Sequence, residues 1–167
     1  FYLFKKGWQG TNIDVNKTSI DLFNIARPND KNICAAISDD AHEVDFFEDD
    51  ILGPVNTIDD KMYEKSKGIF FKKGIKKKIK TSKIFDLISE NILYEKTDFL
   101  NIDAEGSDYK IIKQIDLKNS NINLVAIETH SPNGDILDDF NNISKYFENN
   151  QYFVHKKIGP TTLYTKK

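Results

Sequence analysis

Two kinds of apolar pattern alternate along the chain. Short runs that alternate or are continuously apolar predict strands at residues 11–15, 32–37, 42–47, 75–80, 98–103, 124–128, 152–156 and 162–165. Apolar residues at helical spacing predict helices at residues 16–26, 82–92, 107–115 and 138–149. Residues 1–6 are expected to be the end of a helix, and residues 59–67 a polar helix. This order predicts an α/β fold with a doubly wound, mostly parallel sheet and an antiparallel C-terminal hairpin around Gly159-Pro160.

The predicted helices carry start and stop signals. Asn16, Ser82 and Ser107 stand where a side chain can cap the first turn of a helix. Gly7 closes the first helix, and Arg27-Pro28 ends the second. We expect one domain over residues 1–167.

Residues 49–80 break the alternation, and we expect a variable insertion there. Gly53-Pro54 marks a turn. The lysines at 72–80, next to Phe70-Phe71, either attract an anionic acceptor or form one face of a solvated strand.

Composition narrows the class of protein. The chain has 167 residues, 39% hydrophobic and 30% charged, and its net charge of -2 favours neither nucleic acid nor an anionic membrane as a partner. We find no apolar run of the roughly 18 residues that a membrane span needs. Cys34, the single cysteine, excludes an internal disulfide and favours a cytoplasmic location.

Four predicted strands end in polar residues, at the edge where open α/β sheets bind ligands. Asp14 lies at the end of the strand at 11–15. Its carboxylate can accept hydrogen bonds from both hydroxyls of an adenosine ribose, or simply cap the next helix together with Asn16. Ser38-Asp39 either face an adenine or form a turn. These two strand ends suit a nucleoside.

The other two strand ends are more acidic. On extended backbone Asp103 and Glu105 lie on one side and call for a positive ligand between them, unless Glu105 pairs with a surface lysine. His130 is a candidate for proton transfer, with Glu128 or Asp103 fixing its tautomer, or a structural histidine. Carboxylates with an imidazole can also hold a divalent metal, but this spacing is diagnostic of none, and we assign no metal.

Four segments together resemble the FkbM-type family of S-adenosylmethionine-dependent methyltransferases. They are residues 4–14, 32–39, 98–106 (with Asp103-Ala104-Glu105-Gly106) and 126–130 (Ala-Ile-Glu-Thr-His). The resemblance implies a Rossmann-like fold, S-adenosylmethionine as the cofactor, and methylation of a hydroxyl on a sugar or another small-molecule or glycan acceptor.

The resemblance also implies roles for the strand-end residues. Asp14 matches the residue on the cofactor ribose, Ser38-Asp39 the adenine contact, and Asp103 the position beside the methionine part and the acceptor. We give His130 the role of base, with Glu128 orienting it and Glu105 helping to shape the crevice.

The family pattern has a first strand and a glycine loop before the segment at 1–6, and this sequence starts after them. We therefore expect weaker cofactor binding than with that unit present, and a gap beside residues 11–15. Pairing with the strand at 98–103 or with another chain, as in a homo-oligomer, would close it. An NAD-type oxidoreductase and a non-catalytic binding module remain the alternative functions.

Overall fold

The computed structural model describes residues 2–49, 56–68, 74–131 and 134–166. The strands are β1 (Thr11–Asp14), β2 (Lys31–Cys34), β3 (Ala36–Ile37), β4 (Glu43–Glu48), β5 (Ile75–Ser82), β6 (Phe99–Ile102), β7 (Leu124–Glu128), β8 (Tyr152–Ile158) and β9 (Thr161–Lys166). The helices are α1 (Tyr2–Lys5), α2 (Lys17–Ala26), α3 (Asp60–Ser66), α4 (Ile84–Leu87), α5 (Glu90–Glu95), α6 (Asp108–Ile112) and α7 (Phe140–Asn149). The turn at Gly53-Pro54, Phe70-Phe71 and the first lysines of the basic run lie outside the described residues.

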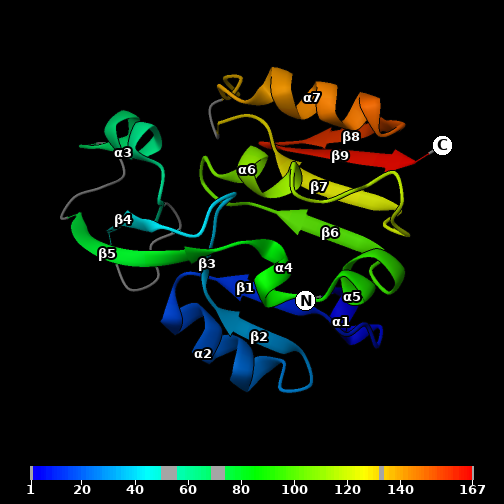
Figure 1. The fold of residues 1–167 in the computed structure, drawn as a ribbon, viewed down its shortest axis with the longest axis horizontal. Helices are drawn as coiled ribbons and strands as arrows, with labels where there is room; N and C mark the ends of the chain where they lie inside the picture. Colours follow the sequence, from blue (N-terminus) through cyan, green and yellow to red (C-terminus); the bar gives the residue numbers. More distant parts are fainter. Residues whose placement is uncertain (1, 50–55, 69–73, 132–133, 167) are drawn as a thin grey trace.

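The strands form three groups in a mixed α/β fold. β1 and β2 pair in parallel, β3-β5-β4 form a mixed group, and β6-β7-β9-β8 form the largest sheet (Figure 1). The β8–β9 hairpin is antiparallel, as predicted. Antiparallel pairing is more extensive than expected because β4 also pairs with β5 in this way. Within the described residues no ladder joins β1 to β6, so direct pairing does not close the edge beside β1.

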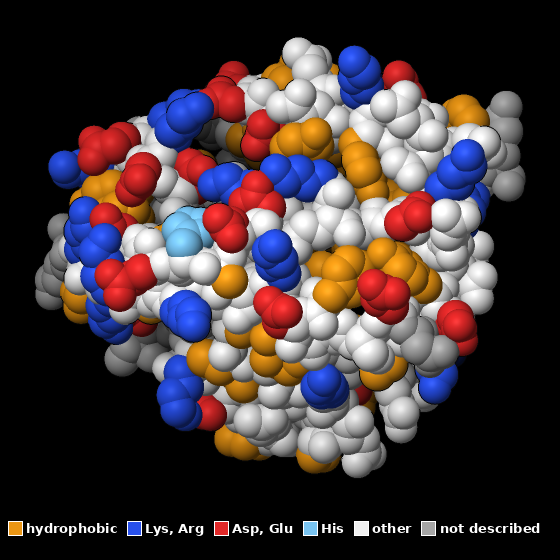
Figure 2. Space-filling view, in the orientation of Figure 1, with side chains coloured by type: hydrophobic (Ala, Val, Ile, Leu, Met, Phe, Trp, Pro, Cys, Tyr) orange, Lys and Arg blue, Asp and Glu red, His pale blue; other side chains and the backbone are white. Residues whose placement is uncertain are grey.

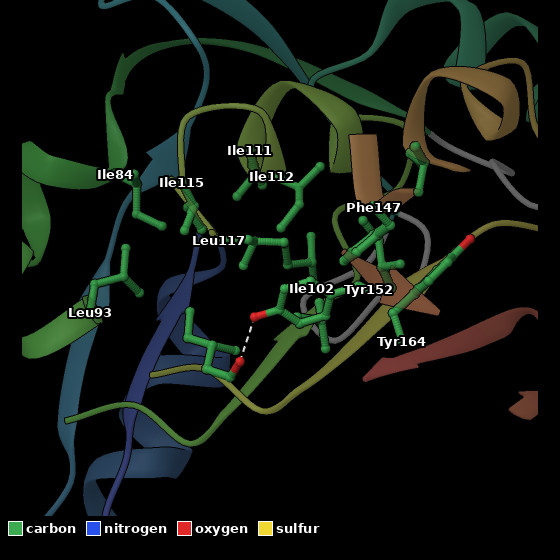
Figure 3. Packing of buried hydrophobic residues seen from close by; sticks show 14 of the residues in the cluster. Ile84, Leu93, Ile102, Ile111, Ile112, Ile115, Leu117, Phe147, Tyr152 and Tyr164 are labelled. Carbon is green, nitrogen blue, oxygen red and sulfur yellow. Dashed lines mark hydrogen bonds between the residues drawn. The ribbon is translucent and has the colours of Figure 1, made fainter. Parts of the chain in front are cut away.

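The core lies on the four-stranded sheet, beneath α6 and α7. Every other residue of a strand faces the same side, and α7 carries apolar residues at helical spacing, so both present continuous apolar surfaces. The rings of Phe147 and Tyr164 stack with centroids 3.9 Å apart. Figure 3 shows Ile112, Leu117 and Tyr152 packed beside them, and all three are essentially inaccessible to water.

Two predicted caps are wrong. Ser82 belongs to β5, and the helix expected at 82–92 is split into α4 and α5 because Ile88 is extended. Ser107 precedes α6, but its side chain makes no capping hydrogen bond. The Asp108 carboxylate instead accepts hydrogen bonds from the backbone N–H groups of Ala104 and Gly106, each at 3.3 Å. Asn16 caps α2 as predicted, through Thr18 and Ser19.

β4, α3 and β5, which lie within or beside the block at 49–80, project from the rest of the molecule (Figure 1). Lysines of β5 pair across the ladder with acids of β4: Lys76 and Lys78 with Asp45, and Lys77 with Glu48. This pairing is what a solvated strand face predicts. On the face drawn in Figure 2, cationic and anionic side chains are interspersed. None of the helices traced here has the length and apolar character to cross a bilayer.

Candidate functional site

A cavity of about 300 Å³ lies at the carboxyl ends of β1, β3 and β6. This volume is at the lower end of the range for small-molecule sites, roughly 300–1,000 Å³. Its walls combine apolar and acidic side chains: Ile13, Ile37, Ile111, Asp14, Asp103 and Glu105. Among the described residues that line it, every ionisable side chain is acidic, so the cavity favours a positively charged ligand.

Asp14 both fixes the turn into α2 and lines the cavity. Its Oδ1 accepts a hydrogen bond from the Asn16 N–H at 2.7 Å, which fixes the turn into α2. Asn16 in turn accepts from the first turn of that helix. The same Asp14 side chain lines the cavity. The turn into α2 therefore holds the Asp14 carboxylate at the carboxyl end of β1, beside the cavity.

Ser38 and Asp39 follow β3 just beyond the lining residues Ala36 and Ile37. The Ser38 hydroxyl donates to Asp39 at 3.2 Å, and Asp39 forms an ion pair with Lys113 of 2.5 Å. The Lys113 hydrogen bond lowers the pKa of Asp39 below its usual value. The carboxylate of Asp39 is thus paired with the ammonium group of Lys113.

The loop between β6 and α6 is tightly turned. Glu105 has φ 47° and Gly106 has φ 94°, so the extended backbone expected for Asp103 and Glu105 is wrong. Thr57 lies 2.6 Å from the carbonyl oxygen of Glu105 and donates to it. A Cβ on Gly106 would lie 3.2 Å from the Cβ of Asp59. Gly106 therefore allows both the turn and the close approach of the segment that leads into α3.

The turn nevertheless brings the expected acids together. One carboxylate oxygen from each of Asp103, Glu105 and Glu128 lies within 4.8 Å of the others. Burial, then the charges of Asp103 and Asp108, raise the pKa of Glu105 to about 7. Burial, then the charges of Glu105, Asp103 and Asp108, raise the pKa of Glu128 to about 8. Partial desolvation of its carboxyl also raises the pKa of Asp103, although the residue is the most exposed of the three. The charged forms are disfavoured because the site concentrates negative charge away from water.

His130 lies at the far end of β7, where it is 5% exposed. Its Nδ1 is 2.7 Å from the Thr129 hydroxyl, which is 2.6 Å from the hydroxyl of Thr162. The edge of the ring packs against Phe140, with centroids 5.4 Å apart. Burial, then the charge of Lys157, lower the pKa of His130. The ring is therefore neutral near pH 7.

The structure divides the predicted site residues into two sets. Asp14, Asp103 and Glu105 line one cavity, and Glu128 joins the last two in the acidic cluster. Ser38, Asp39 and His130 are not among the described residues that line the cavity.

Three residues that line the cavity were not predicted from the sequence. Asn56, Thr57 and Ile58 line the cavity although they belong to the block expected to be a variable insertion. No sequence motif marks these residues. The hydrogen bond of Thr57 to the Glu105 loop and the close approach of Asp59 to Gly106 show that this segment belongs to the site.

One family model matches residues 1–154 of the chain, the Methyltransferase FkbM domain. Searches of curated proteins and of solved structures found no match.

Proposed function

Because the chain belongs to the FkbM methyltransferase domain family, we propose that it transfers a methyl group from S-adenosylmethionine to a hydroxyl of a sugar or another small molecule. One observation carries this proposal beyond the family: the cavity at the strand ends is lined by acids alone among its described ionisable groups. S-adenosylmethionine has a sulfonium, an ammonium and one carboxylate, so its net charge is positive and it suits such a cavity.

The residues around the cavity support an assignment for each part of the cofactor. We assign Asp14 to the ribose hydroxyls, because a carboxylate can accept both hydrogen bonds. The adenine would lie along Ile37 toward Ser38 and Asp39, and Asp103 would face the methionine part. This assignment places β1, β3 and β6 in a Rossmann-like arrangement around the nucleoside.

The reaction needs alignment and a proton acceptor. S-adenosylmethionine, when bound, supplies the methyl group. We assign the proton of the acceptor hydroxyl to the His130 ring. The Thr129 hydroxyl rather than Glu128 holds its Nδ1, and Glu128, Glu105 and Asp103 shape the crevice. In this transfer the new oxygen–methyl bond would form as the sulfonium–methyl bond breaks, so the products would be a methyl ether and a thioether.

Charge also separates this function from the alternative oxidoreductase. NAD carries a diphosphate, which backbone N–H groups or cations must neutralise. The acids that line the cavity would repel it. The second alternative, a non-catalytic binding module, differs from an enzyme only in the transfer step.

Isothermal titration with S-adenosylmethionine and with NAD tests the cofactor. We expect binding of the first only, and Asp14→Asn should weaken it about tenfold or more because a hydrogen bond to a charged group is worth roughly 1.5–3 kcal/mol. Asp21→Asn is the matched control, since Asp21 lies on the exposed side of α2 and pairs with Lys17. Binding of NAD alone would overturn the proposal.

A transfer assay with radiolabelled cofactor and a panel of sugars tests the reaction. With the parent chain we expect a labelled methyl ether of the acceptor. With His130→Gln this labelled product should be lost. Tight cofactor binding without transfer to any hydroxyl acceptor would favour the binding module instead.

A further inference from the structure

Three carboxylates from two strand ends converge at one place. Asp103 and Glu105 follow β6, Glu128 ends β7, and one oxygen of each lies within 4.8 Å of the other two. Charges of one sign at this spacing repel strongly where water is scarce. A fold that holds them together gains stability from any cation that binds there.

The two lysines in or directly after the helix that follows the Glu105 loop are engaged elsewhere. Lys110 of α6 reaches Asp59, and Lys113 pairs with Asp39. Glu128 is only 8% exposed, and no described residue donates a hydrogen bond to its carboxylate or forms an ion pair with it. A carboxylate buried in this way is normally paired or bound to a metal.

A second observation at the same place does not involve the acids. The Ser107 hydroxyl lines the same cavity as Asp103 and Glu105 and is 1% exposed, and its oxygen has no hydrogen-bond partner within the described structure. The Ser107 side chain makes no capping hydrogen bond to the first turn of α6. Buried hydroxyls in proteins nearly always have a partner, so this oxygen points to a ligand in the cavity.

We propose that Asp103, Glu105 and Glu128 form a binding site for a divalent cation of the Mg²⁺ or Mn²⁺ type, with the Ser107 hydroxyl as a direct or water-mediated fourth contact. All the donors are oxygens, which favours Mg²⁺, Mn²⁺ or Ca²⁺ over zinc or copper. A carboxylate has two oxygens, so Asp103 can serve the cation and still face the cofactor.

The catalytic consequence rests on the proposed function. A divalent cation beside the acceptor would stabilise negative charge on the hydroxyl oxygen as its proton leaves for the base. The cation site itself depends only on the acids and on Ser107.

Metal binding is measured first, without cofactor or acceptor. We expect the electron paramagnetic resonance signal of free Mn²⁺ to fall to an endpoint of one ion per chain, and Mg²⁺ to displace that ion. Glu128→Gln should weaken Mn²⁺ about tenfold or more, and Ser107→Ala less. Glu148→Gln, an exposed acid on α7, is the matched control and should leave binding unchanged. Absence of binding at about 1 mM Mn²⁺, the weak end of protein sites, would overturn the proposal.

Further arms keep the result independent of folding and of the enzymatic proposal. Circular dichroism checks that Glu128→Gln is folded. If it is not, Glu105→Gln replaces it and should show the same loss of Mn²⁺ affinity. An equal Mn²⁺ affinity in all the acid variants would show surface binding and overturn the site. Undiminished methyl transfer in EDTA would refute its catalytic role alone, whereas Mn²⁺ binding without any methyl transfer would leave the site standing and count against the proposed function.

Discussion

Removing one charge from the acidic cluster should stabilise the metal-free protein. Glu128→Gln keeps the size of the side chain and its hydrogen-bonding capacity but removes the carboxylate that is most buried in the cluster. Burial and the charges of Glu105 and Asp103 disfavour the ionised form of Glu128 in the folded state. Nothing comparable opposes ionisation in the unfolded chain, so the charge lowers the free energy of unfolding.

The size of this effect follows from the raised pKa. Each pKa unit corresponds to about 1.4 kcal/mol, so a shift from 4.5 to about 8 bounds the cost at about 5 kcal/mol. Solvent screens part of this cost because Asp103 is exposed, and we expect a gain of about 1–2 kcal/mol for the variant.

The pH dependence identifies the cause. Below pH 4.5 the carboxyl is protonated in both states, and the variant should match the parent. As the pH rises toward 8, only the unfolded chain releases this proton freely, so the parent loses stability and the advantage of the variant grows; above about 8 it is constant.

Urea denaturation in EDTA at about pH 4, 6 and 9 measures the difference in the free energy of unfolding. Glu148→Gln, which changes an exposed acid of α7, should show no such trend. An advantage that is absent at pH 9, or equal at all three pH values, would refute the account of buried repulsion.

Two further predictions concern the loop beneath the site. Gly106→Ala should destabilise the protein by about 1–3 kcal/mol more than Gly134→Ala. Both glycines have a positive φ, but only Gly106 lies against Asp59. Equal losses of stability in urea denaturation would contradict this contact. Thr57→Val should lower the free energy of unfolding by about 1–3 kcal/mol in the same measurement, because it removes the hydroxyl that donates to the carbonyl oxygen of Glu105. Unchanged stability would show that this hydrogen bond contributes nothing.

The hydrophobic pattern predicted most of the elements. The strands at β6 and β7 and the helix α7 were readable because their apolar residues recur with the period of the structure they form. The predicted caps were less reliable. Ser107 has the residue type of a cap, but its side chain makes no capping hydrogen bond, and Asp108 instead accepts from the backbone N–H groups of Ala104 and Gly106 in the preceding loop. Residue type gives a side chain the capacity to cap a helix, and loop geometry decides whether it does.

For the candidate site, the sequence by itself determined which strands end in acids, because the chemistry of a strand end is a local property. Asp14, Asp103, Glu105 and Glu128 could all be named in this way. Only the tertiary structure decided that Glu105 reaches the cluster from a left-handed turn and that Thr57 supports this turn from a distant segment. These contacts join residues far apart in the sequence, and their distances depend on packing that no local pattern records.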